Sequence, residues 1–196
     1  DFNGKWHVDR DRGPEDFGFE VGTITAGARK HGQGWMGADW SDYASGYARP
    51  PEGSRAPGEI RREGWGSYQH YGTNENPFND VGHVEAACET IQARPSDRPW
   101  CHFIGPLGPH DPYTAPQRFL DLYDSEAMRL PDSFTDRMED KPGLYRRTRA
   151  RFDQLSEKEH REALKHYYAL CSYEDYLFGR VLNALAASGQ AANTIV

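Results

Sequence analysis

Residues 100–113, WCHFIGPLGPHDPY, contain the segment on which the interpretation of this chain depends. The first six of them, from Trp100 to Gly105, are mostly apolar and predict a short buried strand. The Gly- and Pro-rich run at 105–112 predicts a rigid turn directly after that strand. In open α/β sheets, ligands bind beyond the carboxyl ends of the strands, so His110 in this turn is a candidate functional residue. The alternative is a rigid turn in which the histidine is incidental.

Helical patterns lie on both sides of this strand. A helix is predicted to begin at Asn79 or Asp80, where either side chain can cap it, and to end before Pro95, because apolar residues recur three to four positions apart at Val81, Val84, Cys88 and Ile91. A longer helix is predicted to begin after Ser156, which forms a capping box with Glu159, and to end before Gly189. A further strand is predicted from Thr194. The order helix, strand, helix, strand predicts an α/β fold with a parallel sheet.

The remaining segments carry weaker patterns. Residues 21–79 predict irregular loops with at most short strands, 117–123 a short helix, and 124–153 an irregular segment with a solvated arginine cluster. Within the long helix, Asp175 interrupts an apolar stripe and is expected to be a buried carboxylate bonded to backbone or to an arginine. The stripe consists of Leu164, Tyr168, Cys171, Phe178, Leu182 and Leu185.

Composition excludes several classes of protein. The chain has 196 residues, with 23 Lys and Arg against 30 Asp and Glu, so its formal net charge is −7. The acidic balance argues against a dedicated nucleic-acid binder, which needs a basic face. The mean hydropathy is −0.88, and no apolar stretch approaches the roughly 18 residues of a membrane-spanning helix. Aromatic residues make up 13% of the chain, which argues against disorder.

Near the start of the chain, Lys5 and His7 are two positions apart. In an extended backbone they project to the same side, while Trp6 between them points the other way into packing. A lysine and a histidine that converge suit an anionic group, because lysine supplies a compact positive charge and histidine donates or relays a proton. The alternative is a surface lysine beside a histidine that is satisfied by its neighbours.

Together these motifs resemble those of a known family. The GKWH at residues 4–7 and the PHDPY at 109–113 resemble two signature segments of the sulfatases, within the alkaline-phosphatase-like superfamily. Residues 16–20 resemble the segment that follows GKWH, 116–123 the loop and helix after the histidine, 166–182 the long helix, and 188–196 the entry to a core strand. The resemblance covers most of the chain, with residues 21–79 matching least.

The resemblance implies an α/β/α sandwich with a mostly parallel sheet and the hydrolysis of sulfate esters by a formylglycine nucleophile beside a divalent metal, usually calcium. It implies that Lys5 contacts the sulfate and an oxygen of the nucleophile. It implies that His7 stabilises or deprotonates the second hydroxyl of the formylglycine hydrate. His110 would bind the sulfate and help to protonate the leaving group, as charged transition states require.

Other motifs of the family do not occur in these residues. The Cys/Ser-x-Pro-x-Arg motif that yields formylglycine is absent, and so are the Asp pair and the Asp-His-Gly segment that bind the metal. We therefore expect residues 1–196 to be the central segment of one sulfatase-type catalytic domain, with a loop-rich insertion at 21–79. We expect the calcium ligands to lie outside this segment, and the segment alone to be inactive.

Two other functions remain open. A phosphonate monoester or phosphodiester hydrolase of the same superfamily would share the long helix and the PHxPY segment, although the Lys-x-His pattern of Lys5 and His7 favours sulfate. A non-catalytic, sulfatase-like anion-binding module would explain the missing nucleophile motif. The expected partner is a small-molecule or saccharide sulfate ester, with no nucleic acid and no membrane. The residues indicate neither the particular ester, nor the compartment, nor the oligomeric state.

Overall fold

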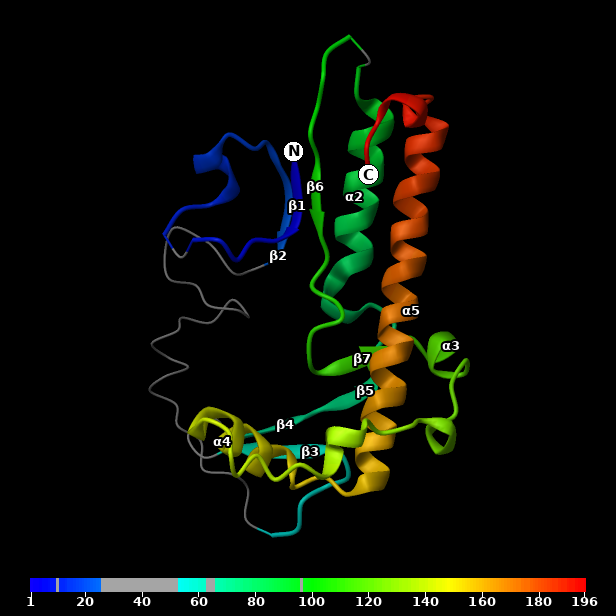
Figure 1. Cartoon of the computed structure of the whole chain (residues 1–196). Coiled ribbons are helices and arrows are strands. Elements are labelled where there is room, and N and C mark those ends of the chain that lie inside the picture. The colour runs from blue at the N-terminus through cyan, green and yellow to red at the C-terminus, as the bar shows by residue number, and fades with distance from the viewer. Residues whose placement is uncertain (10, 26–52, 63–65, 96) are drawn as a thin grey trace. The chain divides into compact units, whose positions relative to one another are not determined.

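The structure, a computed structural model, describes residues 1–9, 11–25, 53–62, 66–95 and 97–196. Contacts divide the chain into two compact units (Figure 1). Unit 1 is drawn from residues 1–45, 76–108 and 172–196, and unit 2 from 46–75 and 109–171. Part of the predicted insertion, residues 26–52, lies outside the described residues.

Unit 1 contains a parallel sheet of three strands in the order β2-β1-β6. These are β1 (Phe2–Lys5), β2 (Val21–Thr25) and β6 (Phe103–Gly105). The helix α2 (Asp80–Ala93) packs against all three strands. Unit 1 also holds the short 3-10 helices at Pro14–Phe17, Pro77–Asn79 and Ala191–Asn193. Phe2 and Trp6 form a buried cluster with Phe19 and Ile24.

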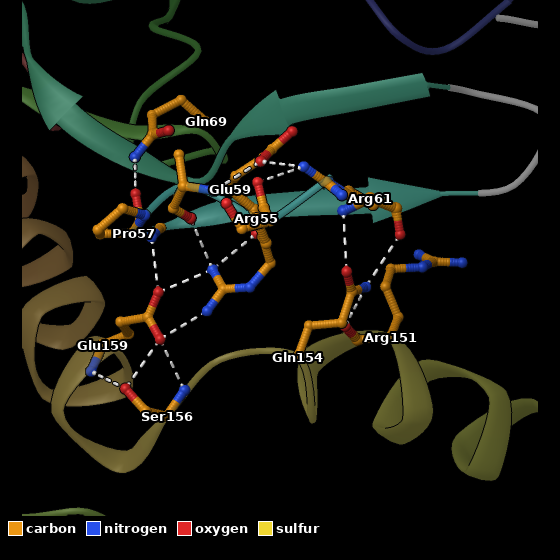
Figure 2. A network of polar contacts seen from close by, with 12 residues as sticks. Arg55, Pro57, Glu59, Arg61, Gln69, Arg151, Gln154, Ser156 and Glu159 are labelled. Carbon is orange, nitrogen blue, oxygen red and sulfur yellow. Dashed lines mark hydrogen bonds and ion pairs between the residues drawn. The ribbon is translucent and has the colours of Figure 1, made fainter. Parts of the chain in front are cut away.

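Unit 2 contains two pairs of strands. The strands β3 (Glu59–Arg62) and β4 (Gly66–Gln69) are antiparallel, and β5 (Tyr71–Thr73) runs parallel to β7 (Tyr113–Ala115). The helices are α3 (Gln117–Leu120) and α4 (Gly143–Phe152), with 3-10 turns at Ser125–Ala127 and Asp132–Thr135. Figure 2 shows how Glu159 ties this unit together through Arg55 and the backbone amide of Gly58.

The longest element is α5 (Glu157–Ala187), whose residues 157–171 belong to unit 2 and 172–187 to unit 1. The predicted capping box is confirmed, because Glu159 N lies 3.3 Å from Ser156 Oγ and the Glu159 carboxylate accepts from Ser156 N at 2.8 Å. Within unit 1, α5 and α2 run side by side (Figure 1), and Arg180 bonds Glu85 across them at 3.1 Å. The helix ends before Gly189, as predicted, where φ is +72°.

The predicted buried stripe of α5 is confirmed at Leu185, which is 5% exposed, and is wrong at three other positions. Tyr168, Phe178 and Leu182 are exposed, at 45%, 49% and 38%. The buried face also carries Ala163, His166, Leu170, Tyr173, Leu177 and Ala184. One position along a helix turns the side chain by about 100°, so a small error in register moves predicted core residues to the exposed side. The expectation that Asp175 is buried is wrong for the same reason, and the carboxylate whose oxygens are buried is that of its neighbour, Glu174.

Other predictions also need correction. The strand predicted from Trp100 begins only at Phe103, whose side chain is 52% exposed, so β6 is not fully buried. Residues 124–153 are not irregular, because they include α4. Thr194 has extended dihedral angles, but residues 194–196 pair with no described strand and form none themselves. Asn79 precedes α2 at a φ of +61° without a side-chain cap bond, and Asp80 bonds a distant loop instead.

The predicted α/β class with a mostly parallel sheet is confirmed. No helix within the described ranges is long and apolar enough to cross a membrane.

Candidate functional site

The first candidate residues lie at the carboxyl end of β1. Lys5 is its last residue and is half-buried, Trp6 is 5% exposed, and His7 is exposed. The Trp6 indole Nε1 donates to the carbonyl of Arg12 at 2.7 Å, and its ring packs edge-on against Phe2. Trp6 therefore points into packing, as predicted. Burial lowers the pKa of Lys5, because a partly desolvated ammonium is less stable than a hydrated one.

The carboxyl end of β6 meets the same edge of the sheet. The register pairs Phe2 with Phe103 and Gly4 with Gly105. At Gly4, φ is +106°, and a Cβ there would lie 2.1 Å from the carbonyl oxygen of Gly105. Only glycine allows this approach, which brings the backbone just before Lys5 against the start of the loop that leads to His110.

His110 belongs to unit 2 and is fixed by its neighbour. Its Nδ1 lies 3.0 Å from Asp111 Oδ1 and also contacts the Asp111 backbone carbonyl, and the imidazole is 36% exposed. The peptide bond from Asp111 to Pro112 is cis. The hydroxyl of Tyr68 on β4 donates to Asp111 Oδ2 at 3.4 Å. Burial, followed by the charge of Asp111, raises the pKa of Tyr68 to about 12, so its hydroxyl is a donor at neutral pH.

Tyr68 and His70 were not predicted from the sequence. Both lie about 40 residues before His110, and their alternation on either side of Gln69 was the only sequence signal. His70 is 6% exposed, its ring centroid lies 4.9 Å from that of Tyr113 in a tilted arrangement, and its Nδ1 has no partner among the described residues. Burial lowers the pKa of His70, which favours the neutral imidazole. The rings of Tyr68, His70 and Tyr113 pack together next to the loop that carries His110.

His102 is a packed histidine. Its Nε2 lies 2.7 Å from Asn3 Oδ1, and Asn3 in turn donates to Thr23 Oγ1 at 2.9 Å. Burial lowers the pKa of His102 to about 4, so the ring is neutral near pH 7. The polar chain continues to His83, whose Nδ1 lies 2.9 Å from Thr23 Oγ1. This chain of contacts links β1, β2 and α2 to the residue that precedes β6.

The sulfatase family model matches residues 57–196. The chain belongs to the sulfatase family. A sulfatase of Formosa agariphila is 32% identical over 105 residues, which cover 50% of this chain and 21% of that protein. A choline-sulfatase of Rhizobium meliloti is 27% identical over 105 residues, covering 52% of this chain and 20% of that protein. The matched part therefore spans about a fifth of these curated sulfatases.

The sulfatase match starts after Lys5 and His7 and includes His110. Lys5 and His7 lie in unit 1 and His110 in unit 2, so their meeting around one group stays a prediction. Within the ranges that the structure describes, no three His, Cys, Asp or Glu side chains are grouped so that they could hold a metal ion. These residues therefore do not fit a calcium site.

Proposed function

We propose that the complete protein hydrolyses a sulfate ester and that Lys5, His7 and His110 act on the sulfate group. The observation that carries the proposal is the arrangement at the end of β1. There Trp6 is buried, so Lys5 and His7 in an extended backbone would project to the opposite side, at the edge where β6 also ends. Membership of the sulfatase family supports the same reaction class.

Chain connectivity supports the inclusion of His110. Gly105 pairs with Gly4, next to Lys5, and His110 follows Gly105 by five residues. Because an extended chain spans at most about 3.6 Å per residue, His110 Cα lies within roughly 18 Å of Gly105 Cα. The side chains of Lys5 and His110 extend beyond their Cα atoms, which shortens the distance between their donor groups. We propose that both donate to the same bound anion.

The chemistry follows from the charge that develops as the ester bond breaks. Lys5 is proposed to bind sulfate oxygens, and its partial burial strengthens that attraction because the local dielectric is low. Asp111 holds His110 Nδ1, so we assign His110 Nε2 the transfer of a proton to the leaving oxygen. His7 is proposed to act on a hydroxyl of the nucleophile.

The nucleophile is proposed to be a formylglycine hydrate outside residues 1–196, because none of Cys88, Cys101 and Cys171 precedes a Pro-x-Arg run. Calcium is proposed as the metal, with ligands that are likewise outside this segment. On this proposal the isolated segment is inactive. The relative named choline-sulfatase suggests a small sulfate monoester as the kind of substrate, and a saccharide sulfate fits the same chemistry.

The test is the hydrolysis of an aryl sulfate by the complete protein and by its Lys5→Ala, His7→Ala and His110→Ala variants. Loss of one charge-stabilising donor or general acid lowers kcat by about 10²–10⁴-fold. Lys158→Ala is the matched control, because Lys158 is exposed on α5 and keeps the same change of charge. Near-normal kcat/KM in all three variants would show that the roles are wrong.

The same assay separates the alternatives. A higher kcat/KM on a phosphate diester or phosphonate monoester than on the aryl sulfate would favour the second superfamily activity. Sulfate binding by calorimetry without turnover, in a complete protein whose gene lacks the Cys/Ser-x-Pro-x-Arg motif, would favour the non-catalytic anion-binding module.

A further inference from the structure

Asp80 ties the loop after β6 to the start of α2. Its side chain is 0% exposed. Asp80 Oδ1 accepts from the backbone N–H of Leu107, and Oδ2 accepts from that of Gly108, both at 2.9 Å. One carboxylate therefore captures two consecutive amides, a geometry that fixes both the position and the direction of the loop. Gly108 precedes His110 by two residues.

Glu174 of α5 lies against the same loop and the same carboxylate. A Cβ on Gly108 would lie 2.1 Å from Glu174 Oε1, so the Glu174 carboxyl packs directly on the Gly108 backbone. The charge of Asp80, whose carboxylate bonds the Gly108 amide, acts on the Glu174 carboxyl. Both oxygens of Glu174 are buried, and no donor among the described residues reaches them. A hydrogen bond between the two carboxyl groups therefore needs a proton that one of them carries.

The surroundings decide which carboxyl carries the proton. Burial raises the pKa of Asp80, but Asp80 accepts two amide N–H groups that act in the opposite direction, whereas Glu174 accepts none. Burial first, and then the charge of Asp80, raises the pKa of Glu174 to about 8. The other titratable group that acts on the pair is His83 of α2, and burial lowers its pKa, so it supplies no positive charge near neutral pH. The pair is one acid and one carboxylate that titrate together.

We propose that Asp80 and the protonated Glu174 are positioning residues that together hold the Leu107–Gly108 loop, and through it the backbone leading to His110, in its working place. The proposal rests on the proposed function for its effect on catalysis. When the shared proton leaves, two like charges lie close together in a buried site, where none of the described cationic side chains bonds either of them. The Asp80 carboxylate then moves away from Glu174, and the two amide bonds weaken.

A second consequence concerns the exchange of backbone protons. Pro106 and Pro109 have no backbone N–H, so Leu107 and Gly108 supply the only two exchangeable amides between them. Asp80 accepts a hydrogen bond from each of these two amides. Their hydrogen exchange, corrected for the intrinsic effect of pH, therefore reports directly on the loop, whether or not the protein turns over a substrate.

The decisive variants differ in what they place against Asp80. Glu174→Gln supplies a neutral N–H donor of the same size, so it mimics the protonated acid at every pH. Glu174→Ala removes the donor, and Asp80→Asn removes one acceptor. Glu89→Gln is the control, because Glu89 is exposed on α2 and undergoes the same substitution.

The experiment measures kcat and KM of the complete protein on an aryl sulfate between pH 5.5 and 9.5, together with amide exchange at Leu107 and Gly108. We expect the wild type and Glu89→Gln to lose activity and amide protection as the pH rises through about 8. Glu174→Gln should keep kcat within about twofold at pH 6.5 and lack this alkaline loss. Glu174→Ala and Asp80→Asn should lower kcat at least tenfold, with smaller changes in KM.

Two outcomes would overturn the proposal. The first is an alkaline loss in Glu174→Gln identical to that of the wild type. The second is a Glu174→Gln protein as impaired as Glu174→Ala, which would mean that the site needs the negative charge of Glu174, for instance to hold a cation. If the wild type hydrolyses no aryl sulfate, the proposed function fails, and exchange at Leu107 and Gly108 still decides the positioning pair.

Discussion

Two glutamates on α5, fifteen positions apart, show how one residue type acts in opposite ways. In unit 2, Glu159 accepts from Arg55 Nη2 and from the Gly58 amide, both at 2.7 Å, and from the Ser156 amide at 2.8 Å (Figure 2). In unit 1, the charge of Asp80 acts on Glu174, and no cation in the described part of the chain bonds the Glu174 carboxyl. Each glutamate helps to hold a loop against α5. Glu159 bonds the amide of Gly58 directly, and Glu174 acts on the Leu107–Gly108 loop through Asp80.

The difference lies in the partner, because the element is the same. The Arg55 guanidinium and the donated N–H groups lower the pKa of Glu159 far below its usual range. Burial and the Asp80 charge raise the pKa of Glu174 to about 8. An interaction with a cation keeps its strength over the whole neutral pH range. An interaction that needs a shared proton weakens as the pH rises and the proton is lost. Substitutions that remove the interactions of Glu159 and of Asp80 and Glu174, one at a time, test this contrast.

The largest effect is expected from the loss of the buried carboxylate. Asp80→Ala leaves two backbone N–H groups without an acceptor, each costing about 1–3 kcal/mol when buried, so we expect the free energy of unfolding to fall by about 3 kcal/mol. Glu159→Ala should cost less, because it leaves one buried amide, that of Gly58, and an Arg55 side chain that is 22% exposed and can be hydrated. Urea unfolding of the complete protein measures both, and an equal loss in the two variants would contradict the contrast.

A smaller, pH-dependent effect separates the two glutamates. The folded pKa of Glu159 is below its ordinary 4.5, so its contribution to stability is present above pH 4.5 and is lost as the pH falls below it. The folded pKa of Glu174 is above 4.5, so the folded state retains a proton that the unfolded chain has lost. Its stability therefore declines as the pH rises from about 4.5 to about 8.

The measurement is the melting temperature of the complete protein from pH 3 to pH 9. Glu159→Gln should flatten the acid limb and Glu174→Gln the limb between pH 4.5 and 8, while each leaves the other limb in place. If either variant flattened both limbs, the two carboxylates would not titrate independently, and the comparison would fail.

Local patterns predicted the elements that local interactions determine. Ser156 and Glu159 are three positions apart, so their capping box is visible in the sequence and is present in the structure. The strand that ends at Gly105 and the turn that carries His110 could likewise be predicted, because glycine and proline mark turns through their own backbone preferences. The α/β class followed from the order of these elements.

The missed features depend on contacts between distant segments. Asp80 resembled a helix cap, yet its partners Leu107 and Gly108 are 27 and 28 residues away. Asp175 was expected to be buried, but the packed face of α5 mixes Ala163 and His166 with larger apolar residues, so the sequence did not reveal that the face is shifted by one position. Gly108, between two prolines, gave one signal of a close approach, but nothing in the sequence identified Glu174 as the group that approaches.

The smallest expected effect concerns the beginning of α5. Ser156→Ala removes the hydroxyl that lies 3.3 Å from the Glu159 amide and 2.8 Å from the Glu159 carboxylate. Loss of a helix N-cap costs about 1 kcal/mol, and Glu159 keeps its bonds to Arg55 and Gly58. Ser156→Thr, which keeps the hydroxyl, is the matched control and should stay within about 0.5 kcal/mol of the wild type in urea unfolding. An unchanged stability in Ser156→Ala would mean that Arg55 and the Gly58 amide alone hold Glu159. The interaction with Arg55 would then contribute still more to stability than the proton-dependent interaction of Glu174 with Asp80.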